Sequence, residues 1–163
     1  MKKYKDLIIY AAIIIFVILF RIFIATPVIV DGISMDPTLK NGDILILNEL
    51  NRSYHYGDIV VINLKNEQII KRVIGVPGDK VEYKGGILYL NGNIKEDNYS
   101  KATKDFSLSS LGYDSIPDNY YLVLGDNRSV SYDSRYIGLI SKNDIMGTVF
   151  NRIYPIDKFG SIK

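Results

Sequence analysis

A long apolar run near the N-terminus limits what this 163-residue chain can fold into more than any other feature. Residues 7–20 read LIIYAAIIIFVILF, and the apolar pattern continues past Arg21 to residue 25. As a helix, residues 7–20 would span about 21 Å, whereas residues 7–25 would span about 28 Å, close to the hydrocarbon core of a bilayer at roughly 30 Å. The longer span crosses a membrane if the Arg21 side chain snorkels to the headgroups. We therefore predict one transmembrane helix over residues 7–25.

A cleaved secretory signal and a buried core helix are the alternatives for this segment. Lysines precede an apolar run of suitable length, as they do in secretory signals. A cut near residue 25 would need small residues before it, but Phe23 and Ile24 stand there. A retained anchor is therefore favoured. Because the lysines precede the span, we expect residues 1–6 to form a short cytoplasmic segment and residues 26–163 to form an extracytoplasmic domain.

Composition excludes several kinds of function. The formal net charge of +2 is too small and too evenly spread to predict a nucleic-acid partner. The sequence has no cysteine, so it has no disulfide framework, no thiolate metal site and no cysteine nucleophile. Its one histidine, His55, lies in the polar, turn-like stretch NRSYHYGD, which predicts an exposed loop residue. We expect no metal and no cofactor.

The pattern after Pro27 is typical of an antiparallel β fold. Short apolar runs alternate with Gly, Asn and Asp, and signals for helices are scarce. Asn91-Gly92 between apolar flanks predicts a two-residue hairpin. The polar stretch 95–119 predicts a surface excursion or a flexible loop. Seven runs read as strands: 43–50, 57–64, 68–76, 80–86, 87–94, 120–126 and 145–153. The expected fold class is mainly β and mostly antiparallel, with one N-terminal transmembrane helix.

Ser34 is a candidate nucleophile, although no histidine lies near it in the sequence. It belongs to the stretch GISMDPT, which follows an extended segment and continues into a proline-containing turn. Gly32 permits unusual backbone dihedrals, so Ser34 could stand on a tight bend with backbone N–H groups beside it. Such donors could stabilise an oxyanion. A plain hydrogen bond within the turn is the alternative role for this hydroxyl.

Lys71 is a candidate base for Ser34. In a strand through EQIIKRVIGVPGD, alternation places Lys71 on one face with Ile69 and Val73. A lysine acts as a general base only when it is neutral, and desolvation by an apolar face lowers its pKa from about 10.4 toward that range. The alternative is a half-buried strand lysine whose ammonium group reaches water.

A third stretch, GDNRSVSYDSRYIG at residues 125–138, concentrates charges and hydroxyls directly after an apolar strand. An ion pair such as Asp133 with Arg135 could make this loop rigid. A hydroxyl such as that of Ser131 could hold a neutral lysine amine in place. The alternative is a polar loop whose charges have no special role.

These stretches, in this order, resemble the type I signal peptidases, which are membrane-anchored serine proteases. The resemblance covers an N-terminal anchor, SMDPTL, NGDILIL, YGDIVVI, KRVIGVPGD and GDNRSVSYDSRYIG. It implies a mostly β catalytic domain that removes signal peptides from presecretory proteins with a Ser-Lys dyad. Ser34 would be the nucleophile, Lys71 the general base and later the acid, and Ser131 the hydroxyl that orients Lys71. The short chain looks like the compact Gram-positive enzymes.

The resemblance also implies supporting roles. Asp126, Asp133, Arg72 and Arg135 would brace the site. Gly32 departs from the pattern, because many members carry a serine there as an oxyanion donor.

The implied preference for small residues before the cut suggests shallow apolar pockets. Met35 and Leu39 are candidates for lining them, and both are equally reasonable as core residues. The expected location is the bacterial cell membrane, with a single pass through the lipid bilayer. A Ser-Lys peptidase with a specialised processing substrate and a non-catalytic, membrane-anchored β domain that binds exported peptides remain alternatives.

Overall fold

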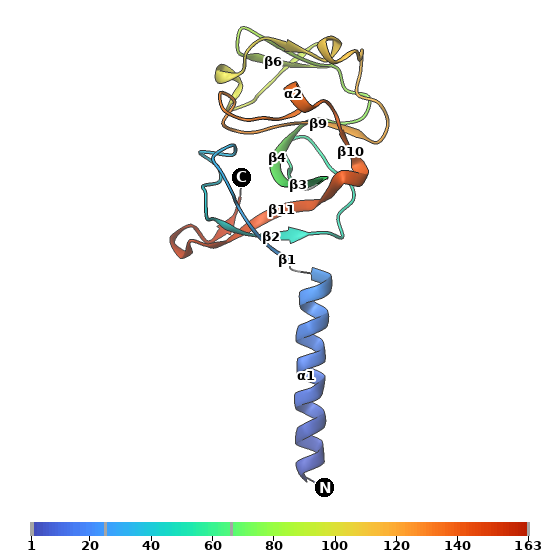
Figure 1. Ribbon diagram of the computed structural model, residues 1–163, viewed down its shortest axis with the longest axis vertical. Helices are drawn as coiled ribbons and strands as arrows, with labels where there is room; N and C mark the ends of the chain where they lie inside the picture. The colour runs from blue at the N-terminus through green and yellow to red at the C-terminus, as the bar shows by residue number, and fades with distance from the viewer. Residues whose placement is uncertain (1, 25, 66, 163) are drawn as a thin grey trace.

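The computed structural model describes the backbone of residues 2–24, 26–65 and 67–162, with side chains for residues 5–17, 26–65 and 67–162. Helix α1 (Lys2–Ile24) extends away from a β body and carries the N-terminus at its far end (Figure 1). Its apolar side chains from Leu7 to Val17 are more than half exposed. A search of the described residues finds no helix long and apolar enough to cross a membrane. The end of the predicted span, including the Arg21 side chain and residue 25, lies outside this description.

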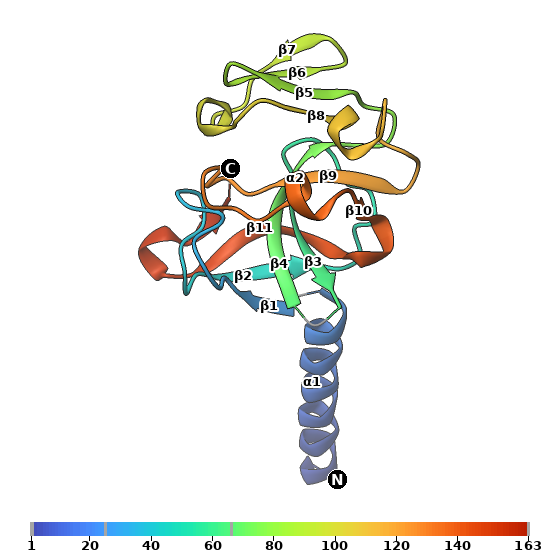
Figure 2. The same cartoon turned by 45° about the horizontal axis from the view of Figure 1, so that its top comes forward.

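The β body contains two antiparallel sheets, which confirms the mainly β prediction. The first sheet has the order β1-β2-β11-β3-β4-β9-β10, and β12 pairs with β11. The second sheet has the order β7-β6-β5-β8 and lies at the end of the molecule far from α1 (Figure 2). The first sheet consists of β1 (Thr26–Ile29), β2 (Ile44–Asn48), β3 (Ile59–Leu64), β4 (Glu67–Gly75), β9 (Tyr120–Leu124), β10 (Ile140–Ser141), β11 (Ile145–Tyr154) and β12 (Gly160–Ser161). The second consists of β5 (Val81–Lys84), β6 (Ile87–Leu90), β7 (Asn93–Lys95) and β8 (Phe106–Ser107).

Short helices complete the connections between strands. They are α2 (Ser134–Ile137) and the 3₁₀ helices η1 (Ser100–Ala102), η2 (Leu108–Leu111), η3 (Lys142–Asp144) and η4 (Ile156–Lys158). Helix α2 is capped by Asp133, whose side chain accepts a hydrogen bond from the Arg135 backbone N–H. This cap lies in the charged stretch 125–138, so local helix-capping chemistry and the candidate site use the same carboxylate.

Each of the seven runs expected to form strands overlaps one, and the run 87–94 overlaps two. Strands β6 and β7 are joined by Asn91 and Gly92, whose φ angles are 55° and 80°. Positive φ at both central positions suits the turn that the Asn-Gly pair predicts. Strands β1, β8, β10 and β12 were not among the predicted runs. They have two to four residues each, so long-range pairing decides their conformation rather than a local apolar pattern.

The segment 95–119 is more than a surface loop. Its β8 pairs with β5, and its side chains of Leu108 and Ile116 are buried against Tyr83 and Leu122. These few apolar side chains are too widely spaced to show a strand or helix period. The predicted excursion therefore closes the second sheet and covers part of the core.

Both faces of the central strands β3 and β4 are buried, and this positions the candidate base. Val61 and Ile70 belong to one apolar cluster, whereas Val60 and Val73 belong to another, with Ile69 packed against it. The alternation is the one expected for β4. Lys71 lies between Ile69 and Val73 on this strand, so its side chain leaves the strand on the same face as theirs.

Candidate active site

Ser34 and Lys71, which are 37 residues apart, are brought into direct contact. Lys71 Nζ donates a hydrogen bond of 2.8 Å to Ser34 Oγ and another of 3.1 Å to the Ile70 carbonyl oxygen. A nucleophile and its base need a separation of about 2.6–3.2 Å for proton transfer. The structure thus joins a hydroxyl and an amine at a distance that suits this chemistry.

The loop between β1 and β2 holds Ser34 in place. Gly32 has a φ of 90°, a conformation that favours glycine, and its N–H donates to Asn41 Oδ1 at 2.8 Å. The Ser34 carbonyl accepts a hydrogen bond of 3.0 Å from the Asn127 N–H, so the loop is tied to the charged stretch 125–138. Met35 and Leu39 on the other side of the loop are buried in the core beside Leu45.

Lys71 is buried, with 3% of its surface exposed. Burial lowers the pKa of its amine, because the charged form loses solvation; the negative charges of Asp133 and Glu67 act in the opposite direction and do not overcome the effect. A lowered pKa increases the neutral fraction of the amine near physiological pH, and only the neutral form accepts a proton.

The bracing carboxylates are each paired with an arginine. Arg72 Nε and Nη2 donate to the two oxygens of Asp126 at 2.8 and 2.7 Å. Arg135 Nε and Nη2 donate to the two oxygens of Asp133, both at 2.8 Å. Such two-point pairs restrict geometry as well as charge. Asp133 also accepts from the Gly125 N–H at 3.0 Å, so its charge is shared among donors other than Lys71.

Ser131 lies in the same buried region, but it does not make the hydrogen bond to Lys71 that the sequence suggests. Within the described residues its Oγ is buried without a hydrogen-bond partner. Gly125 packs closely against it, since a Cβ atom at Gly125 would overlap both Ser131 Oγ and the Ser34 carbonyl oxygen. Gly125 is therefore a part of the site that the sequence analysis did not single out; its position directly after an apolar strand was the available signal.

A groove of about 670 Å³ opens beside Ser34 and Lys71. One wall is β4 from Glu67 to Lys71. Because β9 pairs with β4 only from Arg72 onward, the outer edge of this stretch carries no neighbouring strand in the described part of the chain. Met35 and Leu39 are 1% and 0% exposed and do not line the groove, so the structure supports their role as core residues. The remaining walls come from residues 31–33, Leu64, Val130, Tyr132 and Ile137.

Sequence reasoning did not predict a third buried ion pair, between Arg128 and Asp97. Arg128 and Asp97 have side chains that are 0% and 3% exposed, and Arg128 Nη1 lies 2.7 Å from Asp97 Oδ2. Arg128 Nε also donates to the Gly125 carbonyl oxygen at 3.0 Å. Asp97 lies in the stretch that reads as a polar excursion, and a charged residue there gives no local sign of burial.

The predicted position of His55 can also be compared with the structure. The His55 side chain is 74% exposed and lies near Asp58, which agrees with the predicted loop position. In the part of the chain that the structure describes, no group of three or more potential ligands gathers where it could hold a metal ion.

Comparison with known proteins identifies the family. The family model described as signal peptidase, peptidase S26, matches residues 2–154. Signal peptidase IB of Staphylococcus aureus (strain Mu50 / ATCC 700699) is 42% identical over 165 aligned residues, covering 88% of this chain and 86% of that protein. Signal peptidase I of Bacillus caldolyticus is 40% identical over 156 aligned residues, covering 85% of each chain.

A solved structure agrees with these sequence matches. The crystal structure of a signal peptidase I from Enterococcus faecalis V583 superposes with a TM-score of 0.56 and 31% sequence identity. The match covers 59% of this chain and 96% of that one. The sheets thus have the fold of a signal peptidase I domain. The chain is a member of the signal peptidase family, peptidase S26.

Proposed function

We propose that this chain is a membrane-anchored serine endopeptidase that removes N-terminal signal peptides from exported proteins with Ser34 and Lys71 as a catalytic dyad. The observation that carries the proposal is the 2.8 Å contact between Ser34 Oγ and the buried Lys71 amine, whose pKa is lowered. Family membership supports the peptidase activity, and the groove beside the pair supports an extended peptide as the substrate.

In the proposed acylation step, neutral Lys71 accepts the Ser34 hydroxyl proton while Oγ attacks the scissile carbonyl carbon. The tetrahedral intermediate then collapses as Lys71 returns the proton to the leaving amine, and an ester to Ser34 remains. In deacylation the same amine takes a proton from water, which attacks the ester. The bond from Oγ to the acyl carbon then breaks, Ser34 regains its proton, and the signal peptide leaves with a new carboxylate.

Backbone contacts support the Ser34 N–H as one oxyanion donor. In the described residues this N–H donates to no protein acceptor, so it is available to a substrate oxygen. The Gly32 N–H, by contrast, is already bonded to Asn41 Oδ1. A substrate would therefore need a donor other than the Gly32 N–H as the second half of an oxyanion hole.

The open edge of β4 supports an extended binding mode. A peptide that adds as a strand along residues 67–71 would have its backbone bonded by the sheet and its side chains directed alternately into the groove and away from it. Ile33, Ile70 and Ile137 make part of the groove wall apolar. Such walls suit small apolar side chains before the cut, as signal-peptide cleavage sites of the Ala-x-Ala type provide.

The proposed activity predicts a defined product. Detergent-solubilised protein incubated with a presecretory protein that bears an Ala-x-Ala site should cut once, directly after the second alanine. N-terminal sequencing of the product measures the position. Replacing both alanines in the substrate with bulky residues is the matched control and should prevent the cut. An uncut authentic substrate, or cleavage at unrelated positions, would refute the proposal.

Anchoring by α1 is part of the proposal, with the N-terminus in the cytoplasm and the β body outside. The supports are the apolar, exposed surface of α1 and the lysines that precede its apolar run. Protease added to intact spheroplasts should digest the chain beyond residue 30, because that part would be outside. Immunoblotting against a tag at the C-terminus measures the loss. Protection of the tag until the cells are lysed would show that the orientation is reversed.

A further inference from the structure

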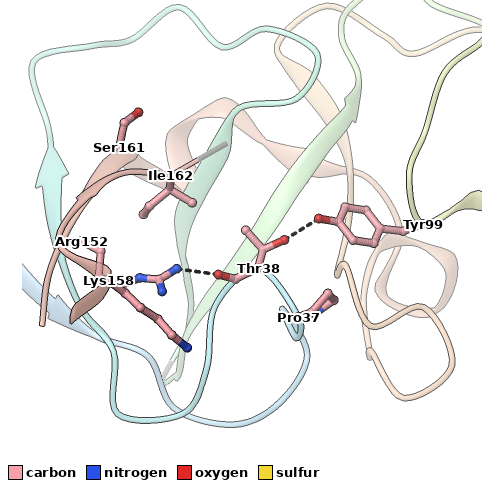
Figure 3. Close-up of a pocket in the computed structure, with 7 residues that line it drawn as sticks. All are labelled: Pro37, Thr38, Tyr99, Arg152, Lys158, Ser161 and Ile162. Atoms are coloured by element: carbon pink, nitrogen blue, oxygen red, sulfur yellow. Dashed lines mark hydrogen bonds between the residues drawn. The ribbon is translucent and has the colours of Figure 1, made fainter. Parts of the chain in front are cut away.

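Tyr99 contacts all three segments that carry the candidate catalytic groups, although it lies between β7 and β8 of the second sheet. Its hydroxyl lies 2.5 Å from Thr38 Oγ1. Figure 3 draws this hydrogen bond as a dashed line between the two side chains. Its ring centroid lies 5.6 Å from the guanidinium carbon of Arg72 and 5.9 Å from that of Arg128. Both distances are within the range of cation–π attraction, about 6 Å.

Each of these partners belongs to a different part of the site. Thr38 follows Ser34 by four residues, and Arg72 is the neighbour of Lys71 in β4 and the partner of Asp126. Arg128 holds the carbonyl oxygen of Gly125, the residue that packs against Ser131 and Ser34. One side chain therefore contacts the loop that carries Ser34, the strand that carries Lys71 and the stretch 125–138.

Tyr99 is itself held from the second sheet. Its N–H donates to Asp97 Oδ1 at 3.0 Å. Asp97 is bonded by both Nη atoms of Arg128, at 2.7 and 3.0 Å, and by the hydroxyl of Tyr83 on β5 at 2.6 Å. Because the Asp97 and Arg128 side chains are almost fully buried, these bonds are shielded from water and hold the backbone at Tyr99 firmly.

We infer that Tyr99 is a positioning residue that sets the approach of Ser34 to Lys71. It is not among the residues that line the groove, so it acts through Thr38, Arg72 and Arg128 rather than on the substrate. The inference rests on the proposed function, since it concerns the geometry of the proposed dyad. Its physical basis is that small displacements of a nucleophile from its base reduce the rate steeply.

The test uses Tyr99→Phe, Thr38→Val and the double variant in the full-length, detergent-solubilised chain. Tyr99→Phe keeps the ring over both guanidinium groups and removes only the hydroxyl. Each single variant should lower kcat by about fivefold, the effect of one hydrogen bond, with KM unchanged. Thr38→Val also removes the 3.5 Å hydrogen bond from Arg72 Nη2. The double variant should be no worse than Thr38→Val, because Tyr99→Phe removes only a bond that Thr38→Val has already removed.

Tyr113→Phe is the matched control, since Tyr113 lines a pocket beside the second sheet. None of the described residues that line this pocket belongs to the Ser34 loop, to β4 or to the stretch 125–138. It should retain the wild-type kcat. A purely structural role for Tyr99 would lower the melting temperature while the folded protein kept its kcat. Wild-type kcat in both single variants, a loss confined to KM, or losses that multiply in the double variant would overturn the inference. Failure of the wild-type chain to cut the substrate would instead refute the proposed function, and with it this role for Tyr99.

Discussion

Replacing Ser34 or Lys71 with alanine should abolish cleavage of a presecretory substrate, with a loss of at least about 10³-fold in kcat. Ser34→Ala removes the atom that would form the acyl-enzyme, and Lys71→Ala removes the group that would accept its proton. The 2.8 Å contact between them predicts that the double variant is no worse than either single one, because each change already stops the same step. Single-turnover cleavage followed by gel electrophoresis measures the loss.

Lys71→Arg tests whether Lys71 acts as a base or only as a structural cation. A guanidinium group keeps its charge across the accessible pH range, so this variant should be as inactive as Lys71→Ala. His55→Ala is the matched control, since the His55 side chain is exposed and lies beside Asp58, outside the contact between Ser34 and Lys71. It should retain nearly full activity. Full activity in Lys71→Arg would eliminate the general-base role, and a large loss in His55→Ala would point to a different base.

The pH dependence of kcat/KM should rise with an apparent pKa below the ordinary lysine value of about 10.4. The sign follows from burial, which disfavours the protonated amine of Lys71 and lowers its pKa. Below the apparent pKa, kcat/KM should rise about tenfold per pH unit, because one proton must leave the free enzyme before it reacts. A short peptide for which chemistry limits the rate is the substrate. A profile that stays flat from about pH 6 to about pH 10 would contradict a lysine base.

Glu67→Gln provides a directional test of the same mechanism. The negative charge of Glu67 raises the pKa of Lys71, against the larger effect of burial. Removing that charge should lower the pKa further and move the kcat/KM profile to lower pH. Glu82→Gln is the matched control, because Glu82 lies on the second sheet and pairs with Lys84. A shift to higher pH in Glu67→Gln, or an equal shift in Glu82→Gln, would disagree with the electrostatic account.

The arrangement of charges explains how a lysine can remain buried beside two carboxylates. The negative charge of Asp133 raises the pKa of Lys71, since an opposite charge favours the protonated amine, but burial lowers this pKa more. Arg72 binds Asp126 and Arg135 binds Asp133, each through two hydrogen bonds. The carboxylates can then brace the loop while desolvation still dominates at Lys71.

Local sequence patterns were sufficient to predict the longer strands and the face on which Lys71 lies. Alternation of apolar residues in β4 correctly grouped Ile69 with Val73, because side chains of a strand point to opposite faces in turn. The Asn91-Gly92 hairpin was also predictable, since its backbone conformation depends on those two residues alone. The order of motifs further indicated the family, which the comparisons confirm.

Long-range contacts were beyond reach of these patterns. Whether Met35 and Leu39 line a groove or lie in the core depends on how the loop that carries Ser34 packs against β2. Both positions suit the same apolar side chains. The burial of Asp97 depends on Arg128, 31 residues away. No local period distinguishes a buried, paired charge from a solvated one, so the segment 95–119 read as a surface excursion.

The sequence alone therefore determined which residues have suitable chemistry: a serine on a glycine-containing bend, a lysine on an apolar strand face, and a loop rich in charges and hydroxyls. Tertiary structure decided which of these meet. It brought Ser34 Oγ to Lys71 Nζ and paired Arg72 with Asp126. It also brought Tyr99 into contact with Thr38 and Arg72. The physical reason is that conformation within a strand or turn depends on neighbouring residues, whereas contacts between them depend on how the whole chain buries its apolar surface.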